Sequence, residues 1–197
     1  MNDSAQPPGS ATLTGGFALF DTALGTCGIA WKSTALTGVQ LPEADAAATR
    51  RRMIRRFPHL REIRPECAPP PFVQSAIEDI EALLRGEPNA PRDLSNIALD
   101  WTGVPPFDRR VLELARTIAP GQTLTYGEMA ARLGEPGAAR AVGQALGHNP
   151  FAPVVPCHRV LAAGSASGGF SARGGVSTKL RMLLAERAAF GAPGLFD

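Results

Sequence analysis

The sequence predicts a small α/β domain followed by a mostly helical domain that contains a helix-turn-helix. Short apolar runs separated by glycines occupy residues 17–39, whereas apolar residues recur at helical spacing over 107–147. Between these regions, residues 102–106 contain one glycine and two prolines, which is typical of a domain boundary. We therefore predict domains over 15–102 and 103–197, preceded by a disordered polar tail over 1–14.

The composition is that of an ordinary globular protein, because 44% of the 197 residues are hydrophobic and 19% are charged. No apolar run reaches the roughly 18 residues of a transmembrane helix, and the N-terminus lacks the features of a signal peptide. The three cysteines, Cys27, Cys67 and Cys157, are too far apart for a disulfide framework or a zinc site. The sequence predicts a protein of a reducing cytoplasm, with no membrane partner and no bound metal.

The first domain begins with three predicted strands, residues 17–20, 26–31 and 36–39, which form a hairpin or an antiparallel meander. Two helices follow, over 44–57 and 72–85, and the second has apolar residues at helical spacing. A further strand is predicted shortly before the boundary, over 97–101. These alternating elements support the α/β class.

Five arginines lie close together in the first predicted helix: Arg50, Arg51, Arg52, Arg55 and Arg56. Such a cluster is compatible with nucleic-acid binding or with a solvated helix face. We favour the solvated face, because residues 1–102 carry ten basic against twelve acidic side chains and the cluster lacks interleaved aromatic residues. Residues 103–197 carry ten basic against six acidic side chains, a modest excess compatible with a phosphate backbone.

The second domain opens with a predicted helix whose apolar positions run from Val111 to Ile118. Thr125 and Glu128 have the spacing of a capping box, so a new helix should begin at Tyr126 and run to residue 133. Glycines and a proline interrupt it over 134–137, and another helix is predicted over 138–147. Two helices joined by a four-residue break form a helix-turn-helix pattern.

The second helix of this pair has one apolar face and one nearly bare face. At 100 degrees per residue, one face carries Ala138, Val142, Ala145 and Leu146, and the other carries Arg140, Gly143, Gln144 and Gly147. Each glycine costs a helix about 0.8 to 1.0 kcal/mol relative to alanine. Close approach to another backbone would compensate, and the pattern by itself fits a neighbouring helix as well as DNA.

The segment from Pro156 to Val160, with sequence PCHRV, places a thiol next to an imidazole. A free thiol has a pKa of about 8.5, so a nucleophilic Cys157 needs a nearby base or positive charge. His158 can serve only if the chain turns there or a water bridges the two side chains. The alternative is a structural cysteine beside an incidental histidine.

Glu186 lies at the edge of a predicted apolar stripe, formed by Val176, Leu180, Leu183 and Leu184, and a carboxylate there would pair with a partner such as His158. The alternative for Glu186 is a solvent-exposed position on the helix.

The order of these motifs is distinctive: TYGE at 125–128, RAVG at 140–143, Asn149 before Pro150, PCHRV at 156–160, GGFS at 168–171, and Glu186. It resembles the methylated-DNA-protein-cysteine methyltransferases, suicide proteins that repair guanine alkylated on O6. The resemblance covers residues 107–186 closely and the first domain only loosely. It implies a ribonuclease-H-like N-terminal domain and a winged-helix-like C-terminal domain.

The resemblance also implies the function. The protein would act as a monomer and without a cofactor on double-stranded DNA, transferring the alkyl group of O6-alkylguanine, and of O4-alkylthymine, to Cys157 once per molecule. The bare helix would enter the minor groove, with Arg140 filling the gap left by a nucleotide rotated out of the stack. The other DNA contacts would come from Thr125, Ala139, Ala141, Gly143 and Gln144.

In the family pattern His158 and Glu186 form a relay with the cysteine, and Asn149 braces the turn before it. The hydroxyl group of Tyr126 would donate to the extruded guanine. The pocket for the base would be lined by Tyr126, Pro156, Val160, Phe170 and Ser171.

Two other functions use the same residues. A non-catalytic lesion sensor would share the DNA-binding helix, but related sensors lack the cysteine found here at position 157. A Cys-His-Glu hydrolase would need an oxyanion hole and multiple turnovers, and it would leave the bare helix with Arg140 unexplained.

Overall fold

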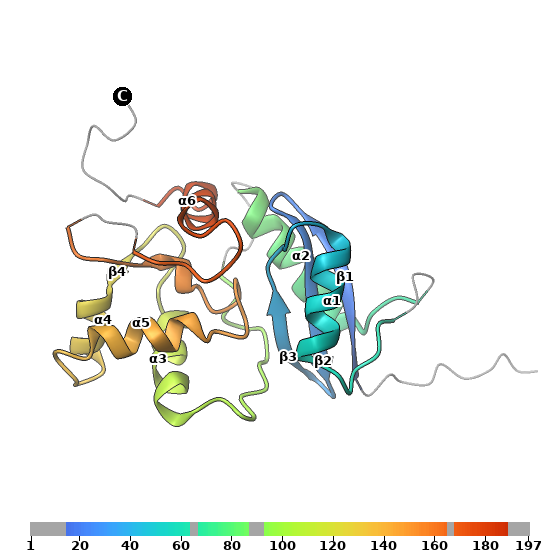
Figure 1. The fold of residues 1–197 in the computed structure, drawn as a ribbon, viewed down its shortest axis with the longest axis horizontal. Helices are drawn as coiled ribbons and strands as arrows, with labels where there is room; N and C mark the ends of the chain where they lie inside the picture. The colour runs from blue at the N-terminus through green and yellow to red at the C-terminus, as the bar shows by residue number, and fades with distance from the viewer. Residues whose placement is uncertain (1–14, 64–66, 87–92, 165–167, 189–197) are drawn as a thin grey trace, which may run out of the picture.

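The computed structural model describes residues 15–63, 67–86, 93–164 and 168–188, so the predicted tail over 1–14 lies outside the described residues. The N-terminal part contains a meander of β1 (Gly15–Thr22), β2 (Gly25–Lys32) and β3 (Ala35–Gln40), with β2 in the centre and both pairings antiparallel. Helices α1 (Ala46–Arg56) and α2 (Pro71–Arg85) flank this sheet (Figure 1). The predicted meander and both predicted helices are confirmed.

The two helices cover opposite faces of the sheet, because successive strand residues point to opposite sides. On one face, Met53 of α1 packs against Phe17 and Ala30. Gly28 allows this close approach, since a Cβ atom there would lie 2.6 Å from Cγ of Met53. On the other face, α2 contributes Val73, Ala76, Ile77 and Ile80 to a larger core that also contains Ala18, Phe20, Ile29 and Trp31.

The strand predicted over residues 97–101 is wrong. Only Leu99 pairs with the sheet, through one isolated parallel bridge to Leu36. The chain then turns away, because Oδ1 of Asp100 accepts a hydrogen bond from the backbone N–H of Thr102 at 2.9 Å and Gly103 adopts a positive φ of 80°. A ladder cannot extend through this turn.

The C-terminal part is mostly helical. It contains α3 (Pro106–Arg116), α4 (Tyr126–Arg132), α5 (Ala139–Gly147) and α6 (Val176–Ala185), and the short strands β4 (Leu124–Thr125) and β5 (Val160–Leu161) pair in parallel. Both hydrogen bonds of the capping box at Thr125 and Glu128 are present. The predicted helix-break-helix of α4 and α5 is confirmed.

The last helix is rotated relative to the predicted stripe of Val176, Leu180, Leu183 and Leu184. Val176 is 38% exposed and Leu184 is 59% exposed, whereas Lys179, Met182 and Leu183 are buried. The rotation follows from polar contacts made on the buried side, because Lys179 and Glu186 both find hydrogen-bond partners there. Glu186 is therefore 3% exposed, more deeply buried than expected.

Apolar packing and two hydrogen bonds to the carbonyl of Pro150 join the N-terminal and C-terminal parts of the chain. Trp101 packs edge-on against Phe151 with ring centroids 5.2 Å apart. The carbonyl of Pro150 accepts hydrogen bonds from the N–H of Val39 at 2.8 Å and from Nη2 of Arg56 at 3.2 Å. Arg56 thus departs from the solvated face predicted for the arginine cluster, whereas Arg50 remains on the surface and pairs with Glu62.

In the described ranges, every helix is too short or too polar to cross a bilayer. The same ranges contain no group of three or more histidine, cysteine, aspartate or glutamate side chains placed to hold a metal ion.

Candidate active site

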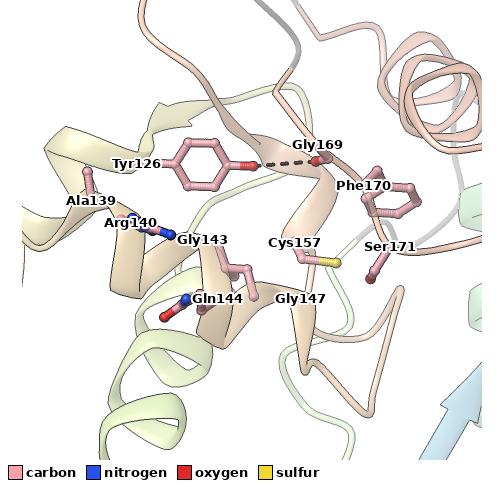
Figure 2. Close-up of a pocket in the computed structure, with 11 residues that line it drawn as sticks. Tyr126, Ala139, Arg140, Gly143, Gln144, Gly147, Cys157, Gly169, Phe170 and Ser171 are labelled. Carbon is pink, nitrogen blue, oxygen red and sulfur yellow. Dashed lines mark hydrogen bonds between the residues drawn. The ribbon is translucent and has the colours of Figure 1, made fainter.

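Cys157 begins a single 3-10 turn, Cys157–Arg159, that follows Pro156. The thiol is 7% exposed and lies at the wall of a cavity of about 460 Å³ between α4, α5 and the loop over 168–171 (Figure 2). His158 and Arg159 are 0% and 4% exposed. The chain therefore turns at the cysteine, which is one of the two conditions under which the thiol and the imidazole could cooperate.

A buried hydrogen-bonded network lies directly behind the cysteine. Nε2 of His158 lies 2.8 Å from Oε1 of Glu186. Arg159 donates to both carboxylate oxygens of Glu186, through Nε and Nη2, each at 2.8 Å. This fork is the geometry in which an arginine binds a carboxylate most strongly. The sequence predicted the His158–Glu186 pair but gave no role to Arg159.

The network fixes the protonation states of its members. Burial alone raises the pKa of Glu186, but the hydrogen bonds and charges of His158 and Arg159 outweigh it and lower the pKa to about 2. Burial lowers the pKa of His158, and the contact with Glu186 opposes that shift. At neutral pH the carboxylate is therefore charged and the imidazole neutral, with its Nε2 proton donated to Glu186.

The other imidazole nitrogen is free to accept a proton. Nδ1 of His158 is buried and has no hydrogen-bond partner among the described residues. Because the Nε2 proton is donated to Glu186, Nδ1 carries the lone pair. The tautomer is thus the one in which His158 can act as a base.

Two groups favour the thiolate form of Cys157. Burial raises the pKa of the thiol, while a hydrogen bond from Asn149 and the positive charge of Lys179 oppose that rise. Asn149 is held by donating to the carbonyl of Val155 at 2.8 Å and accepting from the N–H of Phe151 at 2.9 Å. Asn149 therefore spans the turn before the cysteine.

Lys179, like Arg159, was missed by the sequence analysis. It is 0% exposed, its ammonium donates to the carbonyl of Val160 at 2.6 Å, and it lies 5.7 Å from the ring centroid of Tyr126. Burial lowers its pKa to about 8, despite the opposing effect of Cys157. One signal was available: Lys179, Met182, Leu183 and Glu186 have the i, i+3, i+4, i+7 spacing of a buried helix face.

We expect this buried cation to make the protein more stable as the pH rises from about 8 to 10.5, since its pKa is about 8 when folded and 10.5 unperturbed. In that window the unfolded chain binds more protons than the folded one, so the unfolding free energy grows with pH. Denaturant titrations across the window should show wild type gaining on the order of 1–3 kcal/mol relative to Lys179→Met. A constant difference between the two proteins would contradict the assignment.

The outward face of α5 is as bare as the wheel predicted. Arg140, Gln144 and Gly147 are exposed, and Ala139, Ala141 and Gly143 are partly exposed. Gly143 faces Tyr126, because a Cβ atom there would lie 3.8 Å from the Tyr126 ring (Figure 2). The hydroxyl of Thr125, in contrast, is engaged in the cap of α4, donating to Glu128 at 2.8 Å.

Three of the five residues predicted for the base pocket lie together around the cavity. Tyr126, Phe170 and Ser171 line the cavity beside Cys157, and the Tyr126 hydroxyl donates to the carbonyl of Gly169 at 3.4 Å (Figure 2). Pro156 and Val160 do not line it, because both are buried inside the fold. Val160 pairs in the β4–β5 ladder and gives its carbonyl to Lys179.

The chain is similar to proteins of known family. The family model described as "6-O-methylguanine DNA methyltransferase, DNA binding domain" matches residues 106–188. The methylated-DNA–protein-cysteine methyltransferase of Mycobacterium bovis is 40% identical over 119 residues, which are 60% of this chain and 68% of that protein. The chain belongs to the methylated-DNA–protein-cysteine methyltransferase family.

Other members of the methyltransferase family show how far the similarity extends. The enzyme of Mycolicibacterium paratuberculosis is 46% identical over 112 residues, so the match spans 57% of this chain and 64% of that relative. The crystal structure of the Mycobacterium tuberculosis O6-methylguanine methyltransferase superposes with a TM-score of 0.67 at 33% identity, over 93% of this chain and 99% of that one. Another crystal structure shows the M. tuberculosis protein in complex with DNA, with a TM-score of 0.65 at 32% identity, over 87% of this chain and 92% of that one.

Proposed function

We propose that this methyltransferase repairs duplex DNA by moving the alkyl group of O6-alkylguanine, and of O4-alkylthymine, to Cys157. One observation carries the proposal: Cys157 lies at the wall of a cavity that opens beside the bare face of α5 and is backed by the buried His158–Glu186 pair. A base that leaves the duplex next to α5 would meet the thiol directly. The structure of the M. tuberculosis relative with DNA supports DNA as the partner.

Docking would place α5 in the minor groove. The groove presents a degenerate pattern, which suits a protein that must scan any sequence. Arg140 is exposed at the N-terminal end of α5 and lines the cavity, so its guanidinium can occupy the gap left by the extruded base. Gly143 and Gly147 keep the backbone accessible on the same face.

The chemistry begins with removal of the thiol proton. His158 would accept it at Nδ1, directly or through a water, and Glu186 would stabilise the resulting imidazolium. The thiolate then attacks the alkyl carbon in line with the C–O6 bond. The bonding electron pair leaves with the guanine.

Tyr126 would protonate the departing base. Burial, together with the nearby Cys157, raises the pKa of the Tyr126 hydroxyl, so it keeps its proton at neutral pH. Donation from this group offsets the negative charge that develops on the guanine. The product is a stable thioether, so each molecule reacts once, and a hydrolase with multiple turnovers is disfavoured.

Intact-mass measurement tests the proposal. We expect incubation with a duplex containing O6-methylguanine to add the mass of one methylene group, localised to the peptide that contains Cys157. A matched duplex with unmodified guanine should add nothing. A modification on Cys27 or Cys67 instead, or repeated turnover without a mass change, would overturn the proposal.

Arg140→Ala is expected to separate base extrusion from binding. Losing one phosphate contact would weaken binding to lesion and normal duplexes alike and reduce the salt slope by about one. Losing the guanidinium that fills the gap in the base stack would slow transfer from duplex DNA roughly ten- to a hundredfold. The rate of reaction with the free base O6-benzylguanine, which needs no extrusion, would stay the same. We expect the second pattern, measured by single-turnover kinetics on both substrates.

Arg50→Ala provides the control for Arg140, because Arg50 is a surface arginine paired with Glu62 in the N-terminal part. If Arg140→Ala slowed the free base as much as the duplex, the arginine would belong to the pocket or the fold.

We further propose that the protein acts as a monomer in the bacterial cytoplasm or nucleoid, where its DNA substrate lies. The ribonuclease-H-like and winged-helix-like topologies, and the domain boundary near residue 103, are part of the same proposal. The α/β meander and the paired helices α4 and α5 support them.

A further inference from the structure

The exposed side of α1 is an arginine surface that the proposed alkyl transfer does not use. Arg51, Arg52 and Arg55 are exposed, and α1 contains no acidic side chain. Thr49 and Met53 are buried on the side of α1 that faces the sheet, and at 100 degrees per residue Arg51 and Arg55 point away from that side. The arginine surface is therefore a local positive patch on a half of the chain in which acidic side chains outnumber basic ones.

The two outermost arginines of this surface are uncompensated. Arg52 forms a salt bridge with Glu43, in which Nε lies 3.9 Å from Oε1. In contrast, Arg51 and Arg55 have no hydrogen-bond or ion-pair partner in the part of the chain that the structure describes. They lie one helical turn apart, so their like charges destabilise α1 by about 0.2 to 0.5 kcal/mol. An anion bound to both would remove that cost.

The helix dipole accounts for only one of these two cations. Arg55 lies in the last turn of α1, where a positive charge is favourable. Arg51 lies a full turn earlier, beyond the range of that effect. The dipole therefore gives no reason for a cation at position 51.

The arginine surface adjoins the end of the helix that is proposed to enter the minor groove. A hollow of about 350 Å³ is lined by Arg52 and Arg56 from α1 and by Gly147 and His148 from the end of α5. In Figure 1, this C-terminal end of α5 is the end nearer to the N-terminal part, which carries α1. The proposed DNA-binding face and the arginine surface therefore meet around one hollow.

A duplex docked on α5 extends well beyond that helix. The nine residues of α5 span about 14 Å, whereas one turn of B-DNA rises about 34 Å. The phosphate strands that border the groove therefore continue past Gly147, the end of α5 that lies near α1. Each strand carries one negative charge per roughly 3.4 Å of rise, which complements a pair of uncompensated guanidinium groups.

We propose that Arg51 and Arg55 form a second DNA contact, which binds phosphates on one flank of the lesion while α5 occupies the groove. This inference rests on the proposed function, because that function places the duplex on α5. It gives the N-terminal part a binding role that the alkyl transfer does not require. The contact is made to phosphates alone, so it is independent of the base sequence and of the lesion.

The salt dependence of DNA binding tests the inference. For a duplex of about 24 base pairs, or roughly two turns, the double variant Arg51→Gln with Arg55→Gln should reduce the slope of log K against log salt by about two. The ratio of wild-type to variant affinity should accordingly fall about tenfold between roughly 50 and 200 mM salt. Duplexes with and without O6-methylguanine should give the same change, because the contact does not involve the base.

The double variant Arg50→Gln with Arg85→Gln is the matched control, because it removes the same two charges from the N-terminal part. Arg50 pairs with Glu62, and Arg85 lies at the end of α2, which covers the other face of the sheet. This control should keep the wild-type slope. Equal changes of slope in the two double variants would reduce the effect to net charge and overturn the second contact. An unchanged slope in the first variant would show a merely solvated helix face and would also overturn it.

Neutral methylphosphonate groups locate the contact on the duplex. When they replace the phosphates of one flank at a time, wild type should lose affinity that the first double variant does not lose, and only on one flank. Losses that are equal in wild type and variant on both flanks would contradict the second contact. Absence of transfer from O6-methylguanine, with this salt and flank dependence intact, would instead overturn the proposed function alone.

Discussion

Cys157→Ser is expected to slow alkyl transfer on the order of 10³-fold or more, while binding to a lesion-containing duplex persists. A serine hydroxyl is nearly isosteric with the thiol, but it is far less acidic and a much weaker nucleophile. In the proposed function, α5 and Arg140 carry groove docking and base extrusion, and the substitution leaves both in place. Single-turnover transfer and equilibrium binding should therefore separate cleanly in this variant.

Cys27→Ser is the control for this experiment. Cys27 is fully buried in the N-terminal core, and burial raises the pKa of its thiol to about 12, so it is inert. Transfer by Cys27→Ser should match wild type once the folded fraction is measured. If Cys157→Ser lost lesion binding together with transfer, the cysteine would be a structural residue.

Glu186→Gln is expected to have two effects, because Glu186 serves both His158 and Arg159. Without the carboxylate, His158 loses stabilisation of its protonated form, and transfer should slow about 10- to 100-fold. The guanidinium of Arg159, 4% exposed, is left without its counter-charge, which costs about 3–5 kcal/mol of stability. Single-turnover kinetics and denaturant titration measure the two effects.

The double variant Arg159→Met with Glu186→Gln separates the effect of Glu186 on the rate of transfer from its effect on stability. Removing both buried charges should restore much of the lost stability, because no uncompensated ion remains. Transfer should stay slow, since His158 still lacks its carboxylate. Full recovery of the rate along with the stability would remove Glu186 from the mechanism.

The pH dependence has a defined sign. The pKa of Glu186 is 4.5 when unperturbed and about 2 in the folded protein. Its contribution to stability is therefore fully present above pH 4.5 and is lost as the pH falls toward 2. Glu186→Gln should remove this part of the acid sensitivity, which makes acid titration of the two proteins a direct measurement.

Features set by neighbouring residues were predictable from the sequence. The capping box of Thr125 and Glu128 fixed the start of α4, and the spacing of apolar residues fixed the buried side of α5. The family motif led to the contact between His158 and Glu186. In each of these cases a short or recurrent pattern carries the information.

Features set by distant contacts were not predictable. Lysines are rarely buried, and Lys179 is buried only because the carbonyl of Val160 faces it from β5. Arg56 left the predicted solvated face because Pro150, 94 residues away, offers it a carbonyl. The strand predicted over 97–101 failed because its pairing depends on where the chain leaves the sheet at Gly103.

The carbonyl of Pro150 has a consequence for cooperativity. It is held from the N-terminal part by Val39 and Arg56, and it follows Asn149, which spans the turn before Cys157. A fragment beginning at residue 103 would contain every side chain proposed for the chemistry. It would lack the two hydrogen bonds from Val39 and Arg56 that hold this turn in place. The meander therefore supports the position of Cys157. The N-terminal and C-terminal parts should unfold in a single transition, and substitutions that destabilise the sheet should reduce the reactivity of Cys157.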